Sequence, residues 1–236
     1  MMRFDIATSV EIETSTMASE PASFRALITA FTDFLTVAIH TILYERAIYP
    51  KTSFLSARKY NFPVRQSRHP KVCEWINDAV NSVETELLKG TVERVLVVLY
   101  TKENKPVERF VFDVSRFPSV PASDLDTPLE RRDANGEKLP VLPIVDMEEQ
   151  FRATMSKLAN CATSLRALPE HSAFTVAIEL KSEGQPPIGH PQAWIPVQAT
   201  HDMGGSPNAS KSAVPLRAIA AGEMVFESWI EENGAS

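Results

Sequence analysis

The chain has 236 residues, of which 44% are hydrophobic and 23% are charged, so it can bury a proper core as one domain or at most two. Its formal net charge of −6 and pI of about 5.5 argue against a protein that grips nucleic-acid phosphates through a dense basic face. We therefore expect one acidic domain without direct nucleic-acid binding.

Residues 1–20 are rich in Ser, Thr and Glu and show no sustained period, which predicts a disordered N-terminal tail. They lack the basic start and apolar block of a secretory signal. No uninterrupted apolar run reaches the roughly 18 residues of a membrane span. The sequence thus predicts a chain of the cytosol or nucleus, with no membrane partner.

Two amphipathic helices follow the tail. The first starts at Phe24, after Ser19 and Pro21, and stops before Pro50; its wide apolar stripe predicts a central core helix. The second has Pro70 in its first turn and Gly90 just past its end. Both helices are expected to pack on the strands that come next.

Residues 92–100 are almost continuously apolar, which is typical of a strand covered on both faces, and residues 107–114 alternate as a second strand. The KENKP segment between them predicts a hairpin connection. Residues 116–146 contain five prolines and a charged middle, so we expect a largely disordered surface insertion.

A third helical pattern spans residues 151–165, and residues 174–180 alternate as a further strand. The last fifty residues resemble short strands joined by flexible loop. Such a segment cannot form its own core, so it must pack on the preceding sheet and is free to wrap a partner. The element order predicts an α/β (α+β) fold with an antiparallel sheet.

Catalytic motifs are absent from the sequence: there is no GxSxG, P-loop, GxGxxG or HExxH. The five histidines are spread singly, and only His40 is expected to be buried. Cys73 and Cys161 lack metal-ligand spacing and are interpreted as structural thiols. The sequence predicts no cofactor, no metal and no enzyme; an unrecognised site around His40, His171 or the acidic insertion is the remaining enzymatic alternative.

Two other groups of residues have a binding and a structural interpretation. A basic cluster with interleaved aromatic residues could contact phosphate, but a solvated connector face is the favoured interpretation. The cluster consists of Arg58, Lys59, Arg65, Arg68 and Lys71. Trp75, Trp194 and Trp229 are either core residues or interface anchors. Trp194 lies between Pro191 and Pro196 and is the strongest anchor candidate.

The succession ILYERAIYP, RKYNFPV, HPKVCEWINDAV, VERVLVVLYTKENKPVERFVF, FTVAIEL, AWIP, VPLRAI and SWIEE resembles the HORMA domain. The similarity covers about residues 22–233, except 116–146 and part of 182–212. It implies three helices on an antiparallel sheet, with a core at 21–181 and a C-terminal safety-belt segment at 182–236. Within the family, the small regulatory subunit of DNA polymerase zeta is the most similar branch.

The resemblance implies site residues and partners. A short proline-containing peptide of the catalytic subunit of DNA polymerase zeta would lie under the belt, against Trp75, Trp194 and Pro196. A Rev1-type deoxycytidyl transferase would contact a second surface, formed by Ala213, Glu227 and Trp229. Here Ala213 replaces a larger aliphatic residue and Glu227 replaces an amide. Self-association through the third helix would involve Arg152 and Lys157.

These implications favour a non-catalytic adaptor in translesion DNA synthesis, located in the nucleus. The alternative is a spindle-checkpoint or meiotic adaptor that captures a mitotic or chromosomal partner with the same belt. The KYNFPV and AWIP segments favour the polymerase branch. An extended peptide added to a free strand edge gives backbone hydrogen bonds, and the belt then slows its escape.

Overall fold

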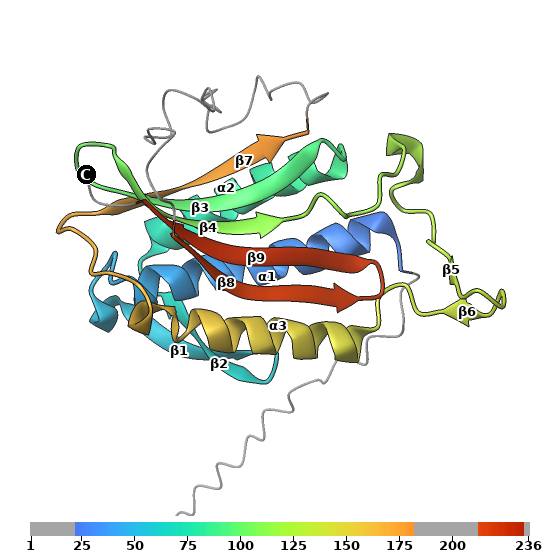
Figure 1. Ribbon diagram of the computed structural model, residues 1–236, viewed down its shortest axis with the longest axis horizontal. Helices are drawn as coiled ribbons and strands as arrows, with labels where there is room; N and C mark the ends of the chain where they lie inside the picture. The colour runs from blue at the N-terminus through green and yellow to red at the C-terminus, as the bar shows by residue number, and fades with distance from the viewer. Residues whose placement is uncertain (1–21, 182–211, 234–236) are drawn as a thin grey trace, which may run out of the picture.

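The computed structural model describes residues 22–181 and 212–233 (Figure 1). Its centre is a five-stranded antiparallel sheet with the strand order β7-β3-β4-β9-β8. These strands are β3 (Val92–Tyr100), β4 (Pro106–Asp113), β7 (Ala173–Leu180), β8 (Ser212–Ala221) and β9 (Met224–Glu232). The predicted α/β class with an antiparallel sheet is confirmed.

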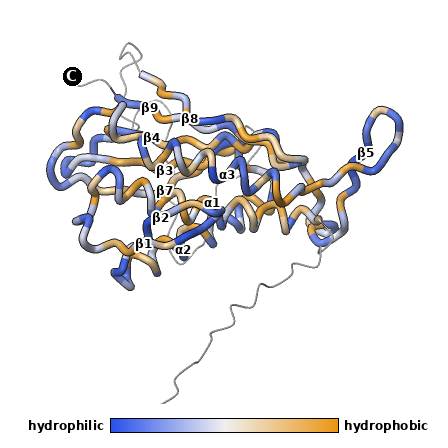
Figure 2. Tube along the Cα trace, turned by 90° about the horizontal axis from the view of Figure 1, so that it is seen from below, coloured by the Kyte–Doolittle hydropathy of each residue, from blue (hydrophilic) through white to orange (hydrophobic). Residues whose placement is uncertain are grey.

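Three helices form the layer that covers one face of this sheet: α1 (Phe24–Glu45), α2 (Pro70–Leu88) and α3 (Ile144–Leu158). Their apolar faces and the inner face of the sheet share one hydrophobic core. Phe34 on α1 stacks on Phe151 of α3, with ring centroids 4.6 Å apart, and Phe31 meets Phe226 of β9 edge-on at 5.2 Å. Figure 2 colours the hydrophobic residues of these helices and strands orange along the trace.

Helix α1 is the core helix that its apolar stripe predicts. Ser23 caps its N-terminus, where the side-chain oxygen accepts a hydrogen bond from the N–H of Ala26 at 3.2 Å. Among the described residues, α1 is the one helix long and apolar enough to cross a membrane. Because 67% of its apolar window is buried between the sheet and the other helices, we assign it to the protein core.

A small antiparallel hairpin connects α1 to α2. After the short helix η1 (Lys51–Ser53) come β1 (Phe54–Lys59) and β2 (Phe62–Ser67). Tyr60 and Asn61 form the turn with φ of 52° and 53°, as a two-residue hairpin turn requires. The sequence predicted only a connector here, because exposed charged residues interrupt the alternating pattern of both strands.

The structure differs from the sequence prediction at residues 116–146, which were expected to be largely disordered. This segment holds η2 (Ala122–Asp124), β5 (Arg131–Arg132), β6 (Lys138–Leu139) and the first residues of α3. Leu125 and Leu129 form backbone hydrogen bonds with the chain around the start of α1. The segment is ordered by these tertiary contacts, which no local periodicity reveals. Its β5–β6 hairpin projects from the body (Figure 1).

Two further element boundaries differ from their prediction. Helix α3 begins at Ile144 and ends at Leu158, earlier than the predicted 151–165; a short helix, η3 (Cys161–Thr163), follows it. The C-terminal region forms one long hairpin, where short strands were expected. Gly222 closes that hairpin at a φ of 64°, and a Cβ there would lie 2.0 Å from the carbonyl oxygen of Val141. This close approach explains why glycine occupies the turn.

Candidate functional site

Strand β7 forms one edge of the five-stranded sheet. It pairs with β3 along its length and, among the described residues, has no strand on its other side. All eight of its residues are half-buried, as expected for an edge strand. Phe174, Val176 and Ile178 face the helices, as their alternation predicted. Within residues 22–181 and 212–233, the outer backbone groups of β7 therefore have no strand partner, and such an edge is able to pair with an added strand.

A cavity of about 440 Å³ opens beside the first residues of β7. It is lined by Tyr49, Lys71, Val72, Trp75, Tyr100, Ala173, Phe174 and Thr175. The rings of Trp75 and Phe174 meet edge-on with centroids 4.8 Å apart, and Tyr49 meets Phe174 in the same manner at 6.4 Å. Burial, with Tyr100 adding to it, raises the pKa of Tyr49, so its hydroxyl stays protonated. The cavity is aromatic with polar tips, which suits a proline or aliphatic side chain.

The C-terminal hairpin lies at the other side of the sheet, where β9 pairs with β4 and β8 forms the outer edge. Glu227 is exposed and Trp229 half-exposed, both on the face opposite the helices, whereas Phe226 and Ser228 are buried. The indole N–H of Trp229 donates to Glu231 at 3.0 Å, and the guanidinium of Arg94 lies over its ring at 5.8 Å.

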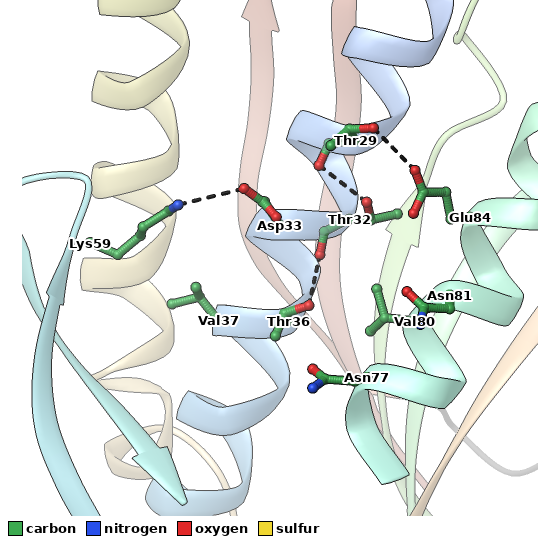
Figure 3. Close-up of a pocket in the computed structure, with 10 residues that line it drawn as sticks. All are labelled: Thr29, Thr32, Asp33, Thr36, Val37, Lys59, Asn77, Val80, Asn81 and Glu84. Atoms are coloured by element: carbon green, nitrogen blue, oxygen red, sulfur yellow. Dashed lines mark hydrogen bonds and ion pairs between the residues drawn. The ribbon is translucent and has the colours of Figure 1, made fainter. Parts of the chain in front are cut away.

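A second cavity, of about 490 Å³, lies between α1 and α2 (Figure 3). Its carboxylates are already engaged: Glu84 accepts a hydrogen bond from Thr29 at 3.1 Å, and Asp33 pairs with Lys59 at 3.5 Å. Threonine and asparagine side chains supply most of the remaining lining. The two carboxylates have different partners and share no nucleophile, so the cavity lacks a catalytic constellation.

The histidines named in the enzymatic alternative do not form a site either. His40 is 4% exposed, and its Nδ1 accepts a hydrogen bond from the backbone N–H of Ser67 at 3.3 Å. Burial lowers its pKa to about 4, so the ring is neutral. His171 lies in the turn before β7, at a φ of 60°. Within residues 22–181 and 212–233, no cluster of three or more His, Cys, Asp or Glu could hold a metal.

The family model of the HORMA domain matches residues 28–213 of this chain. The chain belongs to the HORMA domain family. It is 33% identical over 211 residues to the DNA polymerase zeta processivity subunit of Schizosaccharomyces pombe, covering 89% of this chain and 94% of that one. It is 36% identical over 149 residues to the mitotic spindle assembly checkpoint protein MAD2B of Bos taurus, a match that spans 63% of each chain.

Solved HORMA structures share the fold at low sequence identity. A chain of the mitotic checkpoint complex superposes with a TM-score of 0.63 at 16% identity, covering 88% of this chain and 99% of that one. Caenorhabditis elegans HTP-2 bound to the HIM-3 closure motif gives a TM-score of 0.62 at 11% identity, covering 91% of this chain and 93% of that one.

The HORMA relatives bear the names of a processivity subunit and a checkpoint protein, which supports the prediction that the chain is not an enzyme.

Of the three predicted peptide-binding residues, the structure of this chain describes one. Trp75 lines the cavity beside β7, close to where an added strand would lie. Trp194 and Pro196 lie outside the described residues. Sequence reasoning missed Tyr49, Tyr100 and Phe174, which line the same cavity. Their spacing in the chain gives no local signal, since only the folded sheet brings a loop, a strand end and a strand start together.

The predicted second surface is brought together by the C-terminal hairpin of the HORMA domain. Ala213 pairs with Glu231, and Pro215 pairs with Trp229, so Ala213 lies beside Trp229 on the outer side of the sheet. Ala213 and Glu227 are exposed. Trp229 also packs on the small apolar cluster of Leu96, Val98 and Val111. That indole therefore has a structural role as well as an accessible edge.

The two predicted self-association residues, Arg152 and Lys157, lie on different sides of α3. Arg152 pairs with Glu149 at 3.2 Å on the surface of α3, and Lys157 is exposed. Five positions separate Arg152 from Lys157, which puts them about 140° apart around the helix. Val145, 79% exposed, lies two turns before Arg152 on the same side of α3. Its exposure on a helix was not expected, because the sequence analysis placed Val145 in the insertion and started this helix at residue 151.

Proposed function

We propose that the chain is the non-catalytic small subunit of the translesion DNA polymerase zeta. The similarity to a DNA polymerase zeta processivity subunit, over most of both chains, supports this role. The plant relative from Arabidopsis thaliana with the same name is 30% identical over 167 residues. The observation that carries the proposal is the open edge of β7 beside the aromatic cavity of Trp75, Phe174 and Tyr49.

The partner at this edge is a short, extended, proline-containing peptide of the polymerase catalytic subunit. Its backbone adds to β7 as a further antiparallel or parallel strand, which satisfies the free N–H and C=O groups of the edge. A proline or aliphatic side chain enters the cavity against Trp75 and Phe174. The backbone pairing supplies affinity, and the cavity sets the register.

Residues 182–211 form the belt in this proposal, with Trp194 and Pro196 closing over the bound peptide. The positions of the flanking strand ends support it. Leu180 pairs with Val92 at one end of the sheet, whereas Ser212 pairs with Glu232 toward the opposite end and on the far edge. A belt over the β7 side would join these two ends.

The second partner in the proposal is the Rev1-type deoxycytidyl transferase, held by Ala213, Glu227 and Trp229. These residues share the outer side of the β8–β9 hairpin, away from β7. The two partners would therefore bind at opposite edges of one sheet without competing. A homodimer through α3, with Arg152 and Lys157, is proposed on the family resemblance, and the place of action is the nucleus.

Isothermal titration calorimetry with the proline-containing peptide of the catalytic subunit tests this function. Wild type should bind, and Trp75→Ala should lose roughly 2 kcal/mol, about a thirtyfold increase in Kd, because it removes an aromatic anchor from a desolvated pocket. Trp229→Ala is the matched control, since it removes an indole from the other side of the sheet. Absence of binding by a folded wild-type chain would reject the proposal.

A checkpoint adaptor is the second candidate function, favoured by the name that the vertebrate relatives carry. The same edge and cavity would then capture a mitotic regulator. Affinity purification of the full chain from dividing cells separates the two candidates. Recovery of the polymerase catalytic subunit, lost with Trp75→Ala, supports the polymerase role; recovery of an anaphase regulator in its place reverses the ranking.

A further inference from the structure

Residues 46–73 have an unusual charge for this acidic chain. They contain seven Lys and Arg and no Asp or Glu, whereas the rest of the chain has 17 Lys and Arg against 30 Asp and Glu, a net charge of −13. The run forms the β1–β2 hairpin and the first turn of α2. Arg46 is buried, and the other six cations are exposed or half-exposed: Lys51, Arg58, Lys59, Arg65, Arg68 and Lys71.

These six cations, which we term the basic hairpin surface, are mostly not neutralised. Within the part of the chain that the structure describes, Lys59 alone among them has an ion pair, the 3.5 Å contact with Asp33. Arg65 and Lys51 lie over the ring of Tyr44, at 4.7 and 4.9 Å. These cation–π contacts hold the side chains in place without cancelling their charge. Glu45 interacts electrostatically with both but forms no ion pair with them in the described residues.

The hairpin presents its cations on a fixed ribbon. Ser56 pairs with Arg65 and Arg58 pairs with Pro63, so Arg58 and Arg65 are diagonal neighbours on one face, about 7–8 Å apart. The hairpin is anchored to the core, because Val64, on the opposite face, is buried and the backbone N–H of Ser67 donates to Nδ1 of His40 on α1. The surface therefore presents several separate positive charges at spaced positions, and they do not converge on one point.

We propose that the basic hairpin surface binds the phosphate backbone of DNA. Spaced, separately held cations match a polyanion with regularly repeated charges better than a single anion. Because the remainder of the chain is strongly acidic, its field would favour turning this face toward such a polyanion. The choice of DNA over an acidic protein rests on the proposed function, since a polymerase subunit acts beside DNA. The sequence alone favoured a solvated face; the shortage of acidic partners changes that interpretation.

Fluorescence anisotropy with a labelled oligodeoxynucleotide, single-stranded and then annealed to its complement, tests the proposal on the full chain. Wild type should bind with a Kd on the order of 10⁻⁴ to 10⁻⁶ M, weakening steeply with salt. The double variant Arg58→Gln, Arg65→Gln should bind at least about tenfold more weakly. On single strands, the slope of log K against log salt concentration should become shallower by about 1.4, because two phosphate contacts are lost.

The matched control is Arg131→Gln, Arg132→Gln, which makes the same charge change where the arginines already pair with Glu223 and Glu130. It should leave the Kd for DNA unchanged. Equal losses in both double variants, or no binding by wild type at low salt, would overturn the proposal. So would a poly-glutamate peptide that binds as tightly as DNA with the same dependence on Arg58 and Arg65, which would assign the surface to an acidic protein.

Calorimetry with the polymerase peptide on the same preparations separates this proposal from the proposed function. The Arg58→Gln, Arg65→Gln variant should keep its peptide affinity, because neither residue lines the cavity beside β7. Peptide binding that is retained while DNA binding is absent refutes the DNA surface alone. DNA binding without peptide binding refutes the proposed function and leaves the phosphate contact standing.

Discussion

The guanidinium of Arg46, at the end of α1, donates two hydrogen bonds to the carboxylate of Glu108 on β4, at 2.9 and 2.5 Å. Both side chains are almost completely buried. Arg46 also donates to the carbonyl oxygen of Arg166, whose N–H donates to Glu232 at the end of β9. This network joins the core helix, the sheet, the loop before β7 and the C-terminal hairpin.

Glu108→Ala should therefore be strongly destabilising. It leaves the Arg46 charge buried without its carboxylate partner, at a cost of about 3–5 kcal/mol in the free energy of unfolding. Urea denaturation measures this quantity. Glu130→Ala is the control, because Glu130 pairs with Arg132 and Lys138 on the surface, and its loss should be at most about 1 kcal/mol. Similar small losses for both variants would show that the buried pair contributes little.

His40 should make stability depend on pH. Its folded pKa is about 4 and its ordinary value is 6.5, so the unfolded chain binds the proton more readily. This contribution is complete above pH 6.5 and is lost as the pH falls toward 4, by up to about 3 kcal/mol. His40→Asn cannot take up the proton, so the loss of stability between pH 7 and pH 5 should be smaller in the variant. Identical losses in urea titrations would contradict this account.

Lys71 should select the charge of the bound peptide, because it is exposed and lines the cavity beside Trp75. A peptide with an acidic residue next to its proline should bind about fivefold more tightly than the same peptide with a lysine there. Lys71→Glu should reverse this order in calorimetric titrations at low salt. A preference that Lys71→Glu leaves unchanged would exclude the residue from the peptide-binding site.

The outer side of the β8–β9 hairpin should bind the second partner independently of the first. Glu227→Lys changes an exposed side chain beside Trp229 and should weaken binding of the Rev1-type transferase at least about tenfold, with little effect on stability. Glu103→Lys, in the exposed turn between β3 and β4, makes the same charge change elsewhere. Surface plasmon resonance that finds equal effects for both would move the second partner away from this hairpin.

The sequence allowed the prediction of those elements whose own pattern decides their structure. Helix α2 runs from Pro70 to just before Gly90, as its start and stop residues indicate, and β3 has the continuous apolar sequence of a strand covered on both faces. For α2 and β3 a local signal and the tertiary structure agree. Trp75 lines the cavity beside β7, and its role in peptide binding stays a prediction of the family resemblance.

Other features depend on contacts between distant residues and could not be predicted. Phe117 and Val141, within the segment expected to be disordered, are buried only because the helices and the C-terminal hairpin meet there. The cavity joins Tyr49, Tyr100 and Phe174, which lie more than fifty positions apart in the chain. Composition and periodicity depend on residues that are close in sequence, so neither predicts contacts between elements that are far apart in the chain.

Hydrogen–deuterium exchange of the full chain, with and without the proline-containing polymerase peptide, tests the central claim most directly. If the peptide adds to the sheet at β7, the amides of Ala173–Leu180 that point away from β3 should exchange much more slowly in the complex, while the outer amides of β8 stay unchanged. Protection confined to β8, or no protection at β7 by a peptide that binds, would contradict the account.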